Sequence, residues 1–427
     1  MKQLHKDKAR EFLRNKDYAR WHDETFWSVR SKRDAMASSL PEWETLREKA
    51  SAIKRHTLTH LDEYLEQFTA NAEKNGAIVH WAADAAEFND IVLGILHEHG
   101  VHKLVKSKSM LTEECEMNPF LESKGIEVVE TDLGERIIQL KGQKPSHIVM
   151  PAIHLNHDDV GELFEEKGIS NRKGDHDPTY LTQQARISLR GEFLSADAGM
   201  TGANFAVAST GDVVVCTNEG NADMATSCPK LHIVAMGLEK IVPDYDSLAV
   251  FHRLLARCGT GQCSTTYTSH FRTARPGASP MHIILVDNGR SSWIGNPDHW
   301  ESLKCIRCGA CMNTCPVYRR SGGYSYSYFI PGPIGINLGM LRDPREHAGN
   351  VSACTQCMSC QTACPVKVDL GEQIYRWRQE LGNIGKANPF KLALSDGMSL
   401  VFGHPGLYKA VTAPFRPFHT VFKHLEK

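Results

Sequence analysis

The feature that most constrains the fold of this chain is a run of four cysteines that occurs twice. Both runs have the spacing C-x2-C-x2-C-x3-C-P, and their cysteines are Cys305, Cys308, Cys311 and Cys315, then Cys354, Cys357, Cys360 and Cys364. This spacing is typical of ferredoxins with two [4Fe-4S] clusters, in which the fourth cysteine of each run ligates the cluster of the other run. One tight loop then supplies three thiolates to each cube, and a distant segment supplies the fourth.

The crossed pattern assigns each of these cysteines to one cluster. The first cluster takes Cys305, Cys308, Cys311 and Cys364, and the second takes Cys354, Cys357, Cys360 and Cys315. Zinc is the alternative, because two C-x2-C pairs can form a four-cysteine zinc site. A zinc site needs neither the third cysteine nor the final Cys-Pro. Since both features occur twice, the sequence favours two [4Fe-4S] clusters.

Charge differs between the two runs. Lys304 and Arg307 lie in or beside the first run, with Arg319 and Arg320 nearby, whereas the second run has no charged residue between its cysteines. Positive charge stabilises the reduced form of a cluster. We therefore predict that the first cluster has the higher reduction potential.

Composition excludes several other classes of protein. The 427 residues are 41% hydrophobic and 23% charged, which is typical of a globular protein with two or three domains. Lysine and arginine (49) balance aspartate and glutamate (50), so nothing favours nucleic-acid binding. The polar N-terminus shows no signal peptide, and no window reaches the roughly 18 apolar residues of a membrane span. We expect a cytoplasmic protein without a transmembrane segment, whose membrane contact, if any, is peripheral.

Hydrophobic periodicity divides the chain into four predicted parts. These are an N-terminal helical segment (1–75), an α/β domain (76–290), a helical two-cluster ferredoxin domain (291–385) and a C-terminal tail (386–427). In the α/β domain we expect strands at 101–106, 126–129, 147–150, 231–236 and 282–286. A helix over 110–124 should break at Pro119, another should begin at Pro178, and Thr210-Gly211-Asp212 should form a hairpin turn. The alternation predicts a largely parallel sheet with ligand sites at the carboxyl ends of its strands.

Several segments, together with the cysteine runs, resemble the lactate utilization protein B family, the iron–sulfur subunit of an L-lactate oxidation system. The segments are Gly199-Met200-Thr201-Gly202-Ala203-Asn204-Phe205-Ala206, Thr217-Asn218-Glu219-Gly220-Asn221, Gly237-Leu238-Glu239-Lys240-Ile241-Val242-Pro243, and Thr260-Gly261-Gln262 with Thr265-Thr266-Tyr267. The resemblance implies that the α/β domain is a LUD domain, similar to the NagB/RpiA/CoA-transferase fold. It also implies two partners, a cysteine-rich CCG-domain subunit and a second LUD-domain subunit. Cys228, Cys258 and Cys263 depart from the family pattern, and we interpret them as plain thiols.

The function we expect is electron transfer within an L-lactate dehydrogenase complex. Backbone amides at Gly199, Gly202 and Gly220 are candidates for an anion or substrate site, with Glu219 beside them; the alternative is that these glycines only shape turns. The rival function is a self-contained 2-hydroxy-acid dehydrogenase with a substrate or flavin in the LUD domain. No G-x-G-x-x-G fingerprint supports a flavin or dinucleotide site. The sequence identifies no catalytic base.

Overall fold

The structure is a computed structural model that describes residues 5–274, 277–383 and 389–415. The chain forms two compact units, Met1–Ile374 and Tyr375–Lys427. The second unit contains α20 (Pro389–Gly403), α21 (Pro405–Thr412) and a 3-10 turn η4 (Ala413–Phe415). Residues 386–388 and 416–427 of the predicted tail, and residues 384–385 at the end of the predicted ferredoxin domain, lie outside the described residues. None of the helices that the structure describes is both long enough and apolar enough to cross a membrane.

The N-terminal segment is helical, as predicted. Its helices are α1 (His5–Phe12), α2 (Lys16–Ser38), α3 (Trp43–Thr59) and α4 (Leu61–Lys74). Leu61, Leu65 and Phe68 on α4 are buried against the main sheet. The other helices of this segment lie beside the cysteine-rich region. In α2, for example, Arg33 Nη2 donates a hydrogen bond to the Ala363 carbonyl at 2.9 Å.

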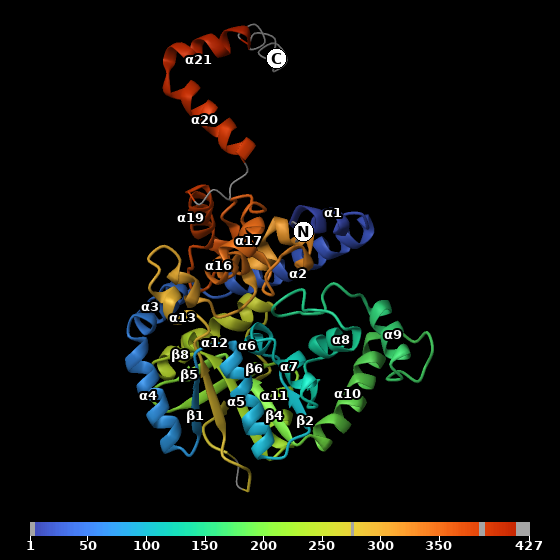
Figure 1. Ribbon diagram of the computed structural model, residues 1–427. Helices are drawn as coiled ribbons and strands as arrows, with labels where there is room; N and C mark the ends of the chain where they lie inside the picture. Colours follow the sequence, from blue (N-terminus) through green and yellow to red (C-terminus); the bar gives the residue numbers. More distant parts are fainter. Residues whose placement is uncertain (1–4, 275–276, 384–388, 416–427) are drawn as a thin grey trace. The chain divides into compact units, whose positions relative to one another are not determined.

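The main sheet has six strands in the order β1-β10-β7-β4-β2-β3, and every pairing is parallel, which confirms the expected parallel sheet (Figure 1). The strands are β1 (Ile78–Ala82), β2 (Lys103–Lys106), β3 (Glu127–Glu130), β4 (Ala198–Gly202), β7 (Leu231–Gly237) and β10 (His282–Val286). Their helices include α5 (Ala85–Glu98), α6 (Met110–Glu114), α7 (Met117–Ser123), α8 (Leu133–Lys141), α9 (His157–Glu166), α10 (Pro178–Ser195), α11 (Asn221–Ser227) and α12 (Tyr245–Gly259).

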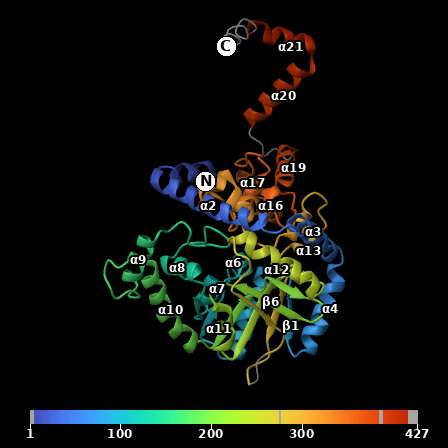
Figure 2. The ribbon, with the colours of Figure 1, turned by 180° about the vertical axis from the view of Figure 1, so that it is seen from behind.

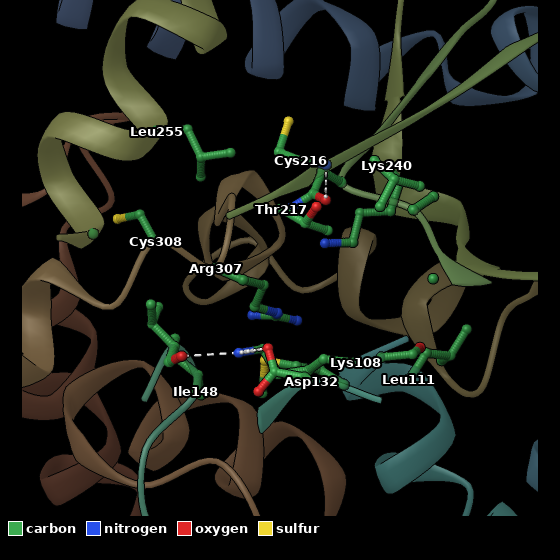
Figure 3. Close-up of a pocket in the computed structure, with 18 of the residues that line it drawn as sticks. Lys108, Leu111, Asp132, Ile148, Cys216, Thr217, Lys240, Leu255, Arg307 and Cys308 are labelled. Carbon is green, nitrogen blue, oxygen red and sulfur yellow. Dashed lines mark hydrogen bonds and ion pairs between the residues drawn. The ribbon is translucent and has the colours of Figure 1, made fainter. Parts of the chain in front are cut away.

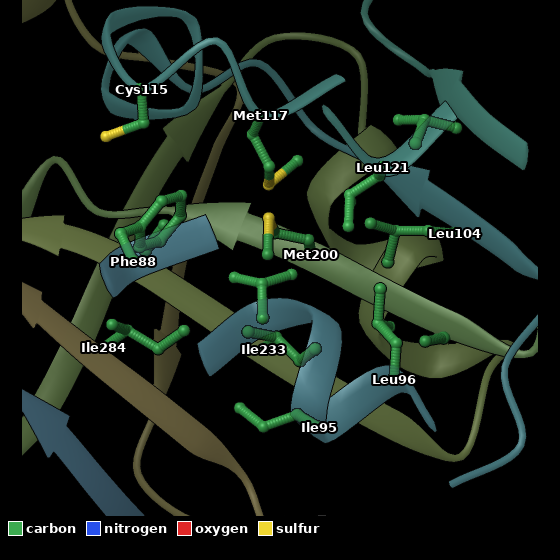
Figure 4. Packing of buried hydrophobic residues seen from close by; sticks show 14 of the residues in the cluster. Phe88, Ile95, Leu96, Leu104, Cys115, Met117, Leu121, Met200, Ile233 and Ile284 are labelled. Atoms are coloured by element: carbon green, nitrogen blue, oxygen red, sulfur yellow. The ribbon is translucent and has the colours of Figure 1, made fainter. Parts of the chain in front are cut away.

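Apolar side chains cover both faces of this sheet. On one face α5 and α7 pack against Leu104, Met200 and Ile233, as Figure 4 shows. The alternate residues Val234 and Met236 of β7 point to the opposite face, where α4 covers them. The sheet is therefore buried on both sides, as parallel sheets usually are.

A second sheet of four strands, which the sequence analysis did not anticipate, has the order β8-β5-β6-β9. Its strands are β5 (Phe205–Val207), β6 (Asp212–Thr217), β8 (Ile241–Val242) and β9 (Tyr267–Phe271), and a short 3-10 helix η1 (Leu238–Lys240) precedes β8. The predicted hairpin is confirmed, since β5 and β6 pair antiparallel across a turn in which Gly211 has φ +76°.

Two local predictions were wrong. Residues 147–150 form a loop, because the buried His147 ring holds them in a turn: its Nδ1 accepts hydrogen bonds from the amides of Val149 and Met150, each at 3.0 Å. The helix expected over 110–124 breaks at Cys115–Glu116. Pro119 lies in the first turn of α7, where its missing amide hydrogen costs nothing.

The cysteine-rich region is helical, as predicted. It begins with α13 (Arg290–Ile294) and the 3-10 helix η2 (Trp300–Lys304), and continues through α14 (Ala310–Thr314), α15 (Pro316–Ser321), η3 (Gly323–Ser325), α16 (Gly332–Arg342), α17 (Pro344–Val351), α18 (Ser359–Ala363) and α19 (Leu370–Asn383). Helix α14 packs against both α2 and α16, which Figure 2 labels. Helices α14 and α18, which contain the third cysteines of the two runs, Cys311 and Cys360, pack against each other.

Candidate functional site

The structure brings the four cysteines assigned to the first cluster around one small cavity. Cys305, Cys308, Cys311 and Cys364, called here the first thiol set, all line it, together with Ile334. Burial and then the neighbouring Cys305 raise the pKa of Cys364, to about 11. The fourth cysteine of the second run therefore lies with the first run, as crossed ligation requires.

The second thiol set, Cys315, Cys354, Cys357 and Cys360, shows the same exchange. Burial and then repulsion from Cys354 and Cys357 raise the pKa of Cys315 to about 11. Burial and then repulsion from the other three members of the set raise the pKa of Cys360. Cys311 also interacts with Cys360, so the two sets are neighbours.

The two cysteine loops have the same backbone conformation. Arg307 and Gly309 in the first run have φ of +60° and +81°, and Gln356 and Met358 in the second have +58° and +60°. This left-handed conformation is unfavourable for side chains other than glycine. It directs amides at the thiols: the Arg307 amide lies 3.4 Å from Cys305 Sγ and the Gln356 amide 3.3 Å from Cys354 Sγ.

These thiol sets fit iron–sulfur cubes better than single zinc ions. Four thiolates on one zinc ion would lie about 3.8 Å apart. Within residues 5–274, 277–383 and 389–415, no three histidine, cysteine or acidic side chains are close enough to share one metal ion. In a [4Fe-4S] cube iron and sulfide alternate at the corners and each iron takes one thiolate, so the four thiolates lie farther apart than around a single ion. Eight thiols, with backbone amides directed at the sulfurs of Cys305, Cys315, Cys354 and Cys364, suit that group.

A larger cavity, of about 380 Å³, lies between the α/β domain and the first cysteine loop (Figure 3). It opens where parallel strands end, at Gly202 of β4 and Gly237 of β7, and its lining also contains Arg307 and Cys308. Parallel sheets commonly bind ligands at this edge. A ligand in this cavity would therefore touch the protein loop that surrounds the first thiol set.

Buried charges connect the cavity wall to the cysteine loop. Glu239 Oε2 accepts a hydrogen bond from Arg290 Nε at 2.5 Å, and Glu239 Oε1 lies 3.5 Å from Arg307 Nη2. Burial opposes ionisation of Glu239, but Arg290, Lys240 and Arg307 outweigh it and lower the pKa of Glu239 to about 2. Arg290 also pairs with Glu114 at 2.8 Å.

The opposite wall carries acidic groups. Glu219 lines the cavity, and its Oε2 accepts a hydrogen bond from the Leu133 amide at 2.9 Å. Desolvation within the cavity, followed by repulsion from Asp132, raises the pKa of Glu219 to about 7. Lys108 lies 3.4 Å from Asp132 and donates to the Val149 carbonyl at 2.8 Å. A carboxyl with a pKa near 7 can give or take a proton at neutral pH.

The four residues proposed from sequence as an anion site separate in the structure. Gly202 and Glu219 line the cavity, but Gly199 and Gly220 are not among its lining residues. Gly199 allows close packing, since a Cβ there would lie 1.6 Å from the Ala225 carbonyl of α11. Gly220 has φ +67° and begins α11. For Gly199 and Gly220 the structure supports the turn and packing alternative.

The cationic side chains of Lys108 and Lys240 in this cavity were not predicted from the sequence, nor was the position of Arg307 in its lining. Lys108 follows the end of β2, Lys240 follows the end of β7, and Arg307 lies in the first cysteine loop. Their positions after strand ends and beside cluster cysteines were the sequence signal that could have identified them. Arg319 was grouped with the first run, but its charge acts on Cys315 of the second thiol set, and it pairs with Asp23 at 3.5 Å. Cys258 is buried beside Cys308, whereas Cys263 is exposed.

Comparison with known proteins matches both halves of this site. Residues 65–286 match the LUD domain, and residues 301–368 match the 4Fe-4S dicluster domain. Lactate utilization protein B of Shouchella clausii is 41% identical over 91% of this chain and 83% of its own length. The protein of the same name from Oceanobacillus iheyensis is 40% identical over 90% and 81%. An uncharacterized electron transport protein of Escherichia coli, YkgF, is 38% identical over 89% and 81%.

Proposed function

Because the chain belongs to the lactate utilization protein B family, with a LUD domain followed by a 4Fe-4S dicluster domain, we propose that it is the cytoplasmic iron–sulfur subunit of a multi-component system that oxidises L-lactate to pyruvate. The observation that carries the proposal is the position of the 380 Å³ cavity, whose wall includes Cys308 of the first thiol set.

In this proposal the first thiol set holds one [4Fe-4S] cluster and the second thiol set holds another. Each cluster, when bound, accepts and passes on single electrons. The protein keeps the two close together, because Cys311 of one set interacts with Cys360 of the other. It also directs amides at the Cys305 and Cys354 sulfurs and buries Cys308, Cys311, Cys360 and Cys364 away from water.

The second thiol set reaches the protein surface. Cys357 is exposed, and the adjacent Met358 is 37% exposed. Arg30 Nη1 donates to Ser359 Oγ at 3.4 Å and stacks on Trp27, which is 45% exposed. We propose that a redox partner docks on this surface, formed by Trp27, Arg30 and Met358. The partners expected for the family are a CCG-domain subunit and a second LUD-domain subunit.

The test is purification of the tagged chain with its partners, followed by assays of iron, flavin and lactate turnover on the same sample. We expect turnover only with the partners present, and its loss in Cys308→Ser although the complex still assembles. Undiminished turnover by a Cys308→Ser complex would overturn the proposal.

The cavity itself favours one second candidate, a self-contained 2-hydroxy-acid dehydrogenase. A pocket of about 380 Å³ has the size of a small-molecule site. Lactate-dependent reduction of the clusters in the isolated chain would support this candidate, whereas reduction only after the partners are added would support the electron-transfer subunit.

A further inference from the structure

The cavity contains a buried guanidinium with unused hydrogen-bonding capacity. The Arg307 side chain is only 10% exposed, and its Nη1 atom has no hydrogen-bond partner within the part of the chain that the structure describes. Figure 3 shows this guanidinium in the middle of the cavity. A buried donor without a partner is costly, so the site gains free energy when a ligand acceptor reaches it.

Lys240 is a second cation in the same cavity. Its side chain lines the cavity in Figure 3, and it forms no hydrogen bond or ion pair with the described residues. Burial and then the nearby Arg307 lower its pKa to about 8, although Glu239 acts in the opposite direction. The Glu239 carboxylate is shared between Arg290 and Arg307. The positive charges of Arg307 and Lys240 in the cavity are therefore only partly neutralised.

Acidic side chains in the lining of the same cavity supply hydrogen-bond acceptors for a hydroxyl group of a ligand. Glu219 and Asp132 line the cavity, as do Thr217 and Asn204. Asp132 is engaged by Lys108, and one oxygen of Glu219 is used by the Leu133 amide, which leaves its other oxygen for a ligand hydroxyl. The cavity therefore combines donors for an anion with an acceptor for an O–H group.

We propose that this cavity binds a small 2-hydroxycarboxylate anion, with its carboxylate held by Arg307 and Lys240 and its hydroxyl directed at Glu219. The choice of a 2-hydroxy acid rests on the proposed function; the choice of a carboxylate rests on the cations themselves. Arginine and lysine are suited to this role, because charge-assisted hydrogen bonds to carboxylates are the stronger kind.

The position of Arg307 links ligand binding to the first cluster. Arg307 lies between Cys305 and Cys308, so an anion bound to it would place negative charge beside that cluster. Negative charge disfavours reduction, so the ligand lowers the reduction potential of the first cluster. By linkage, reduction of the cluster weakens binding of the anion and promotes its release.

The first experiment measures binding by calorimetry to the full chain, purified without oxygen and with its clusters. The probes are L-lactate, propionate, which lacks the hydroxyl, and L-lactamide, which lacks the charge. We expect L-lactate to bind, propionate to bind several-fold more weakly and L-lactamide not to bind. Equal affinity for L-lactate and L-lactamide would overturn the proposal, as would the absence of L-lactate binding.

Variants test the named residues. Lys240→Gln should weaken L-lactate binding by about 10-fold or more, and Lys240→Arg should retain most of it. The matched control is Lys167→Gln, a surface lysine that does not line the cavity, which should leave the affinity unchanged. Iron content and visible spectrum report whether each variant carries its clusters. A fully loaded Lys240→Gln protein with wild-type affinity would contradict the assignment.

The second readout is an EPR redox titration of the isolated chain with and without saturating L-lactate. The ligand should lower the potential of the first cluster, and the shift should shrink in Lys240→Gln; identical potentials with and without ligand would refute the linkage. If the isolated chain binds no L-lactate but its clusters are reduced in the complete system, this inference fails and the proposed function stands. If it binds L-lactate but its clusters stay oxidised during turnover, the proposed function fails instead.

Discussion

Arg307 Nη2 lies 3.5 Å from Glu239 Oε1, so a cysteine-loop residue and a residue just beyond β7 share one buried contact. Glu239 also accepts from Arg290, and Lys54 of α3 donates to its backbone carbonyl. Three parts of the chain, far apart in sequence, therefore meet at Glu239: α3 at its backbone carbonyl, and the region of Arg290 and Arg307 at its carboxylate. These contacts hold the α/β domain and the cysteine-rich region in place around the cavity.

Crossed ligation predicts how cysteine variants group. Cys364→Ser should perturb the same EPR signal as Cys308→Ser, because both residues belong to the first thiol set. Cys315→Ser should perturb the same signal as Cys357→Ser. The exposed Cys263 provides the control, and Cys263→Ser should leave both signals unchanged. A Cys364→Ser spectrum that matched Cys357→Ser would refute the crossing.

Arg307 should raise the potential of the first cluster. Replacing it in Arg307→Gln removes a positive charge from the loop that also contains Cys305 and Cys308, so that potential should fall by on the order of tens of millivolts. The potential of the second cluster should change less, because Arg307 lies between Cys305 and Cys308 of the first run. An EPR redox titration measures both values, and two unmoved potentials would contradict the prediction.

Most of the fold could be predicted because it depends on local patterns. The parallel strands, the helix at Pro178 with its Asp177 cap and the hairpin at Gly211 all have sequence signals of a few residues. The segment 147–150 has a strand-like composition, but its outcome depends on a distant contact, the 3.0 Å hydrogen bond between His147 Nε2 and Asn313 Oδ1. No local pattern contains that information.

Gly199 should be needed for packing. In Gly199→Ala the added Cβ would lie 1.6 Å from the Ala225 carbonyl, so α11 would have to move, at a cost of about 1–3 kcal/mol in unfolding free energy. Gly94 in α5 is the matched control, because a Cβ there meets open space. Gly94→Ala should leave stability unchanged or raise it by up to about 1 kcal/mol. Equal unfolding midpoints for the two variants would contradict this role.

Buried His232 should make stability depend on pH. Burial lowers its pKa from 6.5 to about 3, and its Nε2 lies 2.9 Å from Thr201 Oγ1. The folded state therefore holds His232 neutral, while the unfolded chain takes up a proton below pH 6.5. This contribution is present above pH 6.5 and is lost as the pH falls toward 3, by about 2 kcal/mol between pH 7 and 5.

The free energy of unfolding is measured by urea titration at pH 7 and pH 5, for the wild type and for His232→Asn, each with its iron–sulfur clusters bound. The variant should lose about 2 kcal/mol less over this interval, because it has no histidine to protonate at this position. Equal losses in the two proteins would show that His232 is not responsible.

The cluster site was accessible from sequence, but the cavity was only partly so. The cysteine spacing predicts which thiols group together, and the repeated run predicts that the fourth cysteine of each run lies with the other run, as Cys364 does. The cavity depends on side chains from separate elements, such as Lys240 after β7 and Arg307 in the cysteine loop, which only the tertiary fold brings together. Glycine spacing indicated Gly202 but also Gly199, since close packing and ligand binding both select glycine.

We propose that electrons from L-lactate pass through two [4Fe-4S] clusters bound to this chain. The most direct measurement is freeze-quench EPR of the complex purified with its partners, mixed with L-lactate without oxygen. We predict that reduced-cluster signals assigned to both thiol sets appear at least as fast as pyruvate forms in the steady state. Pyruvate formation at the full rate with both clusters still oxidised would show that the electrons do not pass through them.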